Sequence, residues 1–224
     1  LNPFEETAAH AGRIILQSPV LSAPKMDRLK ALDQEGYEQE HIKLAFDPSL
    51  GLKEAVQSVC ERAVRAVRSG KSLLILSDRE VRSDQWVISA IMATGAVHHS
   101  LISEGLRCAA NIVVDTGEAR DSHHFAVLLG FGATAVYPYL SYRVINQLVN
   151  SAELIGDPLE LHQNYRKGIN KGLLKILSKM GISTIASYRG AQLFEAIGLA
   201  EEVVKLCFFG VQSRIAGADF SDFE

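Results

Sequence analysis

Residues 51–76 read GLKEAVQSVCERAVRAVRSGKSLLIL and contain the two elements that decide the fold. Apolar side chains recur every three or four residues between Val56 and Val67 while arginines take other positions, which predicts an amphipathic helix over 51–69. A glycine then ends the helix. The run Leu73–Leu76 is too short for a helix and is apolar throughout, as in a strand buried on both faces. The stretch therefore predicts a helix that leads into a central strand.

The same alternation of elements continues on both sides of this stretch. Short apolar runs predict strands, and amphipathic or capped segments predict the helices between them. The expected strands lie near 42–46, 73–76, 108–114, 134–137 and 182–187, and the further helices near 84–104, 121–129, 140–150, 158–180 and 192–197. Strands that alternate with helices form parallel sheets covered by helices. The predicted fold class is therefore α/β, with a mostly parallel sheet and alternating helices.

The N-terminal part of the chain lacks a strand pattern. Segments 5–17 and 25–32 have helical patterns instead. We expect an N-terminal helical arm over 1–40, packed on the sheet or on another part of a longer protein, and one α/β domain over 41–224. Because the first residue is not methionine, we expect the chain to be a piece of a longer polypeptide.

Charge and hydropathy exclude several classes of partner. Lys and Arg number 23 and Asp and Glu number 26, which gives a net charge of −3 with both signs scattered along the chain. Such a chain has no broad attraction for phosphate backbones or anionic lipid, so neither nucleic acid nor a membrane surface is an expected partner. The longest apolar stretch, around 126–136, is too short to cross a bilayer.

The three cysteines, Cys60, Cys108 and Cys207, lie far apart in the sequence. An odd number at wide spacing is typical of a reducing compartment and matches neither a disulfide framework nor a cysteine metal cage. We expect all three to be small buried side chains. We also expect a cytoplasmic location.

One segment carries side chains suited to acid–base chemistry or metal binding. Asp115, Glu118, His123 and His124 follow an expected strand, at the end where parallel α/β folds place their chemistry. One interpretation is therefore a stand-alone β/α enzyme or a metal- or phosphate-binding domain that uses these four residues. The structural interpretation is preferred, because adjacent histidines point about 100° apart on a helix and Asp121 is well placed to cap that helix.

Two other patterns have structural interpretations. Gly130–Ala135 fits the letters of a dinucleotide-binding fingerprint, but a helix precedes these glycines and a strand follows, which reverses the order that the fingerprint needs. We expect a plain turn there. His98 and His99 stand side by side among small apolar residues, and we expect them to be packed and hydrogen-bonded rather than metal-bound.

The best local candidate for function is a short loop made of Ser187, Tyr188, Arg189 and Gly190. It follows an expected strand, so it would be exposed at the sheet edge where α/β folds carry function. Its hydroxyls, guanidinium and flexible backbone suit contact with a partner surface or an anion. Lys179 is a second candidate, since a cation at a helix end complements the helix dipole or meets an acidic neighbour.

Several motifs in chain order carry a resemblance to a known family. They include ATGAVHH at 93–99, DSHHF at 121–125, PYL at 138–140, GLLKI at 172–176, SKMGIST at 178–184, SYRGAQ at 187–192 and FEAIGL at 194–199. Together they resemble the central domain of the large subunit of glutamate synthase, from about Ser18 to Ile215. Departures are small: Phe131 stands where the family would have tyrosine, and Ala216 where it would have glycine.

The resemblance implies one domain of a multidomain enzyme that makes two glutamates from glutamine and 2-oxoglutarate. In that family an amidotransferase domain releases ammonia, which travels through an internal tunnel to an FMN-binding barrel that carries an iron–sulfur cluster. The resemblance also implies that this chain is a non-catalytic connecting domain. Its sheet would be (β/α)-barrel-like or a partial barrel, and it would link the two other domains and help shape the tunnel.

The same resemblance implies that no catalytic, cofactor-binding or metal-binding residue lies in this chain. FMN, the iron–sulfur cluster and the contact with an electron-donor subunit or ferredoxin would belong to the rest of the parent enzyme. Lys179 and the loop 187–190 then become candidates for contact with the flavin domain or the ammonia route. A domain cut from its neighbours exposes apolar surface that they normally cover, so we expect the isolated chain to self-associate.

Overall fold

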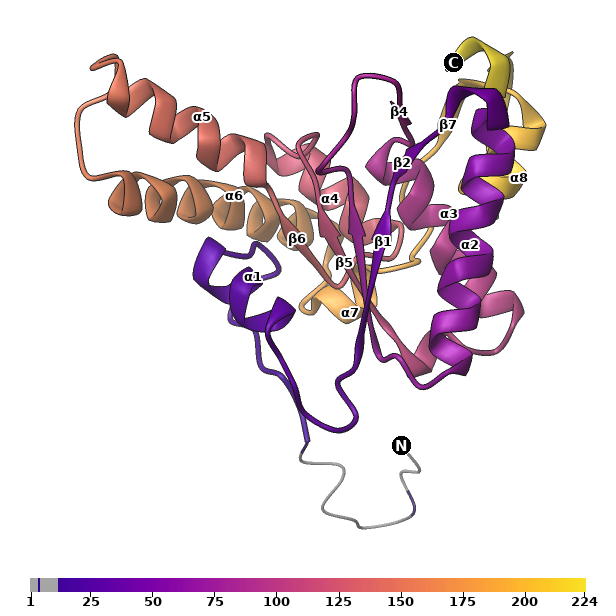
Figure 1. Cartoon of the computed structure of the whole chain (residues 1–224), viewed down its shortest axis with the longest axis horizontal. Helices are drawn as coiled ribbons and strands as arrows, with labels where there is room; N and C mark the ends of the chain where they lie inside the picture. The colour runs from indigo at the N-terminus through magenta and orange to yellow at the C-terminus, as the bar shows by residue number, and fades with distance from the viewer. Residues whose placement is uncertain (1–3, 5–11) are drawn as a thin grey trace.

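The computed structural model describes residue 4 and residues 12–224 (Figure 1). Its α-helices are α1 (Ala23–Lys30), α2 (Leu52–Arg68), α3 (Ala90–Ser103), α4 (Ser122–Gly130), α5 (Tyr139–Asn150), α6 (Pro158–Met180), α7 (Ile185–Tyr188) and α8 (Glu201–Cys207). The strands are β1 (Gln39–Lys43), β2 (Ala45–Phe46), β3 (Leu73–Ser77), β4 (Trp86–Val87), β5 (Asn111–Asp115), β6 (Ala135–Tyr137), β7 (Ala196–Leu199) and β8 (Ser213–Ala218).

The central sheet is parallel, and its strands follow in the order β1-β3-β5-β6. The order of the strands in the sheet is the same as their order along the chain, as in a (β/α) barrel. In a doubly wound sheet the strand order reverses partway across the sheet. Val20 forms a parallel bridge with Val136, so the chain before α1 extends the edge at β6. Within the described residues β1 and β6 do not pair with each other, so the sheet is open. The predicted α/β class with a partial barrel is confirmed.

The two faces of this sheet are covered differently, because alternate residues of a strand point to opposite sides. One face contributes Leu74, Leu76, Ile112, Val114 and Val136 to the main core, which it forms with α2, α3 and α4. The other face contributes Leu73, Ile75, Val113, Ala135 and Tyr137 to a smaller core with Met26 and Leu29 of α1. The helices that connect the strands therefore lie on one face, and α1 covers the face that a closed barrel would turn inward.

The best predicted elements are those whose local signals are strong. The apolar positions of α2 are all buried while its arginines Arg62 and Arg65 are exposed, as the periodicity predicts. At the start of α6, the side chain of Asp157 accepts a hydrogen bond from the backbone N–H of Glu160, at 3.1 Å. Gly181, at φ 68°, ends the helix. The helix predicted at 25–32 is confirmed as α1.

Two predicted elements are wrong, and a third, the helix near 84–104, starts later than predicted. Residues 182–187 do not form a strand: the hydroxyl of Thr184 caps the backbone N–H of Ser187 and starts the short helix α7. The helix expected at 192–197 is a loop followed by β7, which pairs with the distant strand β8. The helix expected at 84–104 begins only at residue 90, because β4 pairs with β2 in a small antiparallel ribbon.

Two further expectations also need correction. Of the helix expected at 5–17, residues 12–17 are not helical and residues 5–11 lie outside the described part of the chain. Cys60 and Cys207 are buried as expected, but Cys108 is exposed in a short turn before β5. The three thiols are free in the structure.

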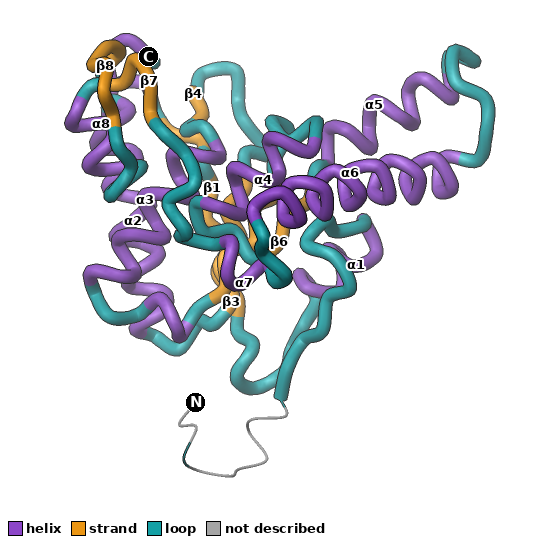
Figure 2. Tube along the Cα trace, turned by 180° about the vertical axis from the view of Figure 1, so that it is seen from behind, coloured by secondary structure: helices purple, strands orange, loops and turns teal. Residues whose placement is uncertain are grey.

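The C-terminal elements form a second unit of structure beside α3. Seen from behind, β7, β8 and α8 lie on the side of the molecule opposite the long hairpin of α5 and α6 (Figure 2). Gly95 of α3 allows this packing, because a Cβ at that position would overlap the carbonyl oxygen of Cys207. The loop that leads from α7 to β7 passes the end of α4, where the backbone N–H of Gly190 donates to the carbonyl of Gly130, and Gly190 lies beside His98 of α3.

Candidate functional site

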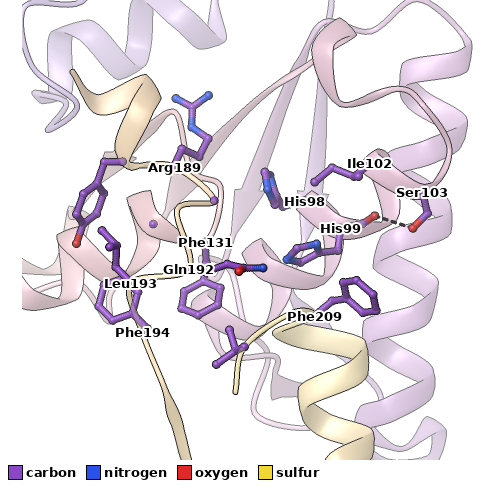
Figure 3. A pocket seen from close by; sticks show the side chains of 14 residues that line it. His98, His99, Ile102, Ser103, Phe131, Arg189, Gln192, Leu193, Phe194 and Phe209 are labelled. Carbon is purple, nitrogen blue, oxygen red and sulfur yellow. Dashed lines mark hydrogen bonds between the residues drawn. The ribbon is translucent and has the colours of Figure 1, made fainter. Parts of the chain in front are cut away.

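A cleft of about 500 Å³ opens between α3, the end of α4 and the loop after α7 (Figure 3). Three of the four predicted loop residues, Tyr188, Arg189 and Gly190, line this cleft. The backbone N–H of Gly190 donates to the carbonyl of Gly130 at 2.8 Å, which fixes the loop against α4. The predicted loop therefore forms one wall of a cleft, although it follows helix α7 and not a strand as expected.

The remaining predicted residues lie elsewhere. Ser187 is exposed, and its hydroxyl lies 2.9 Å from that of Thr184 in the cap of α7. Lys179 is exposed in the last turn of α6 and does not line the cleft. Ser187 and Lys179 were predicted together with Arg189 as contact residues, but only Arg189 of these three lines the cleft.

The buried side chain of His98 lines the cleft and is hydrogen-bonded to Arg107, which is half-buried and does not line the cleft. The guanidinium Nε of Arg107 donates to Nδ1 of His98 at 2.8 Å. Its other nitrogens donate to the carbonyls of Ala110 and Gly132, at 2.6 and 2.9 Å. Burial and then the charge of Arg107 lower the pKa of His98 to about 3, so the ring is neutral at pH 7. The expected packing and hydrogen bonding of this histidine are confirmed.

The hydrogen bond from Arg107 also decides where the ring proton of His98 sits. Because Nδ1 accepts, the neutral ring carries its proton on Nε2. That nitrogen faces the loop, since a Cβ built on Gly190 would lie 3.7 Å from it. His98 therefore presents an N–H donor to the cleft.

Arg189 brings a second guanidinium to this region. Its Nε is buried and has no hydrogen-bond partner. Burial lowers the pKa of Arg189, and its charge lowers the pKa of both His98 and Arg107. Neither Arg107 nor Arg189 forms an ion pair with a carboxylate in the part of the chain that the structure describes. Among the residues that line the cleft, Arg189 is the cation, and there is no acidic side chain.

The cleft also has an apolar side. The rings of Phe131 and Phe194 stack with centroids 5.7 Å apart, and the rings of His99 and Phe209 lie 5.6 Å apart. Phe209 is 62% exposed and Ile102 is 49% exposed, although both side chains line the cleft. The lining of the cleft therefore combines the guanidinium-bearing side chain of Arg189 with exposed apolar side chains.

A glycine makes the approach of α3 to the turn after α4 possible. Gly132 has φ 124°, and a Cβ there would lie 2.5 Å from Cγ of the His98 ring. The segment Gly130–Ala135 is the turn between α4 and β6 that the order of elements predicts. Its glycines serve backbone conformation and close packing.

The carboxyl end of the central sheet holds the first member of the other predicted cluster. Asp115 is fully buried at the end of β5 and receives hydrogen bonds from Nζ of Lys30 at 3.0 Å and Nε of Arg79 at 3.1 Å. Arg79 also lies over the ring of Tyr139, 4.4 Å from its centroid. Asp115 is therefore engaged by side chains from α1 and from the end of β3.

Glu118, His123 and His124 have separate structural partners. Glu118 accepts hydrogen bonds from the N-terminus of α3, namely from the hydroxyl of Ser89 at 3.0 Å and the backbone N–H of Ala90 at 3.1 Å. Burial raises the pKa of Glu118, and these hydrogen bonds oppose the rise.

The two histidines lie at the start of α4. As predicted, Asp121 caps this helix by accepting from the backbone N–H groups of His123 and His124. Nδ1 of His124 accepts from the backbone N–H of Arg120 at 3.3 Å, while the ring of His123 is near Phe194, with centroids 6.4 Å apart. The four predicted residues thus do not form one constellation. Among the described residues, no group of three or more His, Cys, Asp and Glu side chains is arranged to hold a metal ion.

The sequence did not point to Arg107 or Phe209 as site residues. Arg107 lies in a short turn with no motif around it, and Phe209 comes from a segment far along the chain. The adjacent histidines of α3 were the available signal, but their setting indicated packing alone.

Among the residues that the structure describes, no helix is long and apolar enough to traverse a bilayer.

The fold and the site define a class: an α/β domain with an open, barrel-like sheet whose carboxyl end is occupied by its own side chains. Comparison with known proteins is more specific. The family model "Glutamate synthase central domain" matches residues 1–200. The chain belongs to this family.

Curated relatives agree with this assignment. The chain is 41% identical over 237 residues to ferredoxin-dependent glutamate synthase 1 of Arabidopsis thaliana, with 99% of this chain and 14% of the relative covered. It is 40% identical over 219 residues to the glutamate synthase (NADPH) large chain of Bacillus subtilis, with 98% and 14% covered. For the glutamate synthase (NADH) of Saccharomyces cerevisiae, the values are 38% over 232 residues, with 98% and 11% covered.

The chain therefore spans between about one tenth and one seventh of the length of these relatives. Among solved structures, the flavin-binding domain of baker's yeast flavocytochrome b2 is similar at 17% identity and a TM-score of 0.49. That similarity covers 89% of this chain and 46% of the other.

Proposed function

We propose that this chain is the connecting domain of a glutamate synthase. It links the amidotransferase and FMN-binding domains of the same longer polypeptide and helps shape the route along which ammonia passes between them. The parent enzyme makes glutamate from glutamine and 2-oxoglutarate, and it takes electrons from a donor subunit or from ferredoxin. The isolated chain is inactive.

The observation that carries this proposal is the cleft itself. The buried Nε of Arg189 in its wall has no acceptor among the described residues, and its apolar rim is exposed at Phe209 and Ile102. A surface that combines exposed aromatic side chains with arginine is typical of protein interfaces. Family membership supplies the partner, because relatives carry this segment inside chains many times its length.

We propose that FMN and the iron–sulfur cluster lie outside this chain. A parallel α/β sheet of this kind binds cofactors at the carboxyl ends of its strands. Here that end does not fit a flavin phosphate, because the cations Lys30 and Arg79 are already engaged by the buried Asp115. In addition, α1 packs on the face that would form the barrel interior. The three cysteines lie far apart in the sequence, and among the described residues they do not come together in a group of three or more ligating side chains, as a cluster requires.

The test is the coupling of the two half-reactions in the full-length protein. Glutamine hydrolysis and glutamate formation are measured together in the wild type and in Arg189→Ala and Lys179→Ala. Arg82→Ala is the matched control, because Arg82 is an exposed arginine that pairs with Asp84. We expect Arg189→Ala to release more ammonia per glutamate formed, while the control stays coupled. If both variants transferred ammonia as well as the wild type, the residues assigned to the connection would be wrong.

A further inference from the structure

The even scatter of charge along the chain has one exception, which lies in and around α6. Residues 161–194 contain no Asp or Glu but six cationic side chains: Arg166, Lys167, Lys171, Lys175, Lys179 and Arg189. Of the 23 Lys and Arg residues, the other 17 share the rest of the chain with all 26 Asp and Glu residues. This stretch is therefore positive, while the remainder of the chain is negative.

Four of these cations form a lysine stripe along one face of α6, made of Lys167, Lys171, Lys175 and Lys179. The first three each stand two positions before a buried apolar residue, namely Ile169, Leu173 and Leu177. Two positions correspond to about 200° around a helix, so the lysines lie opposite the face that packs on the domain. All four are exposed, and the stripe is about 18 Å long at 1.5 Å per residue. Helix α6 belongs to the hairpin with α5 that extends to one side of the central sheet (Figures 1 and 2).

The lysine stripe has no carboxylate partner in the part of the chain that the structure describes. None of its members forms an ion pair there. Of the lysines outside α6, most do: Lys30, Lys43, Lys53 and Lys205. Like charges four residues apart on a helix repel, so this spacing destabilises α6, and the helix dipole compensates only in the last turn, which holds Lys179. The stability of this domain therefore does not account for the stripe.

The surface complementary to the stripe is acidic, and its surroundings favour a protein surface of limited extent. Leu174 is 66% exposed and lies on the same face, three residues after Lys171, so a partner here meets an apolar side chain as well as charge. A nucleic acid or an anionic membrane would extend beyond α6 and meet the negative remainder of the chain. Interfaces between domains of one chain are more polar than permanent interfaces between subunits, whose cores are depleted in lysine. Relatives carry this segment inside much longer chains.

We propose that the lysine stripe of α6 docks an acidic surface patch on a neighbouring domain of the same longer protein. The proposal rests on the connecting function, because that domain lies outside residues 1–224. It adds a second contact, separate from the cleft, and names its chemistry. Carboxylates of the neighbour pair with the lysines of the stripe, and an apolar side chain of the neighbour covers Leu174.

The experiment is carbodiimide cross-linking of the full-length protein, because this reagent joins a lysine to a carboxylate only where the two are in contact. Cross-linked peptides are identified by mass spectrometry, and we expect peptides from 167–179 joined to an Asp or Glu outside residues 1–224. Hydrogen–deuterium exchange in that acidic segment is then compared between the wild type and the double variant Lys171→Gln/Lys175→Gln. Exchange should be about tenfold faster in the double variant, because the contact loses two ion pairs. Lys43→Gln is the control and should leave it unchanged, since Lys43 is an exposed lysine that pairs with Glu80.

Four other outcomes would each overturn the proposal. Cross-links confined to carboxylates within residues 1–224 of the same chain would mean that the domain neutralises its own stripe. Cross-links between isotope-labelled and unlabelled chains would mean that a second copy is the occupant. Acetylation of the stripe in the full-length protein as fast as that of Lys43 and Lys205 would mean that water covers it. Protection from acetylation that is lost on nuclease treatment would mean that nucleic acid binds there.

The coupling of glutamine hydrolysis to glutamate formation is measured on the same samples, which separates this proposal from the connecting function. Coupling that persists without the cross-links refutes the docking surface and leaves the connecting function in place. The expected cross-links in a protein that stays coupled after Arg189→Ala support the docking surface and refute the contact assigned to Arg189.

Discussion

Replacing Asp115 by Asn should destabilise the domain substantially, because Asp115 is a structural anion. Its side chain is fully buried, while those of its partners Lys30 and Arg79 are 32% and 29% exposed. Removing one member of a buried ion pair costs about 3–5 kcal/mol. The partly exposed cations can turn toward water, and the Asn oxygen keeps one acceptor, so the lower end of about 3 kcal/mol applies here.

The assay is urea unfolding of the wild type, Asp115→Asn and the control Asp84→Asn. Asp84 forms an ion pair with Arg82 in which both side chains are about 70% exposed, so its replacement should cost less than about 1 kcal/mol. The structural interpretation of Asp115 would be refuted if its variant were as stable as the control. It would be refuted more strongly if the variant kept its stability but lost binding of phosphate or Zn²⁺, since that would revive the ligand-binding alternative.

The remaining predictions concern His98, two glycines and the exposed apolar surface. Burial and the charge of Arg107 lower the pKa of His98 to about 3 when folded, so below its unfolded pKa of about 6.5 the unfolded state binds the extra proton. The stability that depends on neutral His98 is therefore complete above about pH 6.5 and is lost as the pH falls toward 3, by about 2 kcal/mol at pH 5. Thermal melts of His98→Gln should lack this part of the decrease in melting temperature with falling pH. The prediction would be contradicted if the wild type and the variant lost stability equally between pH 6.5 and pH 3. Gly132→Ala should be more destabilising than Gly70→Ala by about 1–3 kcal/mol. Both glycines have a positive φ, but only at Gly132 would the added Cβ meet a side chain, the ring of His98. Equal losses of stability in urea unfolding would mean that backbone strain at positive φ accounts for both variants and that the contact with His98 adds nothing. The isolated chain should self-associate through surface that includes Phe209 and Ile197, which are 62% and 72% exposed; a monomeric sedimentation profile at high concentration would speak against this.

The sequence was most informative where local signals and tertiary structure agree. Helix α2 has its arginines on one side and its apolar residues on the other, and α6 has an Asp cap, an initial proline and a terminal glycine. These signals depend on neighbours in the sequence, so they can be read without the fold. The consecutive strands β3, β5 and β6 are apolar runs buried on both faces, which periodicity also identifies.

Prediction failed where a distant partner or a single hydroxyl decides the structure. Trp86 and Val87 become β4 only because β2 lies beside them, and β7 exists because residues 213–218 pair with it. The cap at Thr184 outweighs the apolar run that indicated a strand. The cleft depends even more on tertiary structure, since residues between His98 and Val211 build it from four separate parts of the chain.

Electron cryomicroscopy of the full-length protein tests the connecting role most directly. We predict that the rim of the cleft at Phe209 and Ile102 is covered by a domain that lies outside residues 1–224, with Arg189 at the contact. A complete protein in which this rim faces solvent would contradict it.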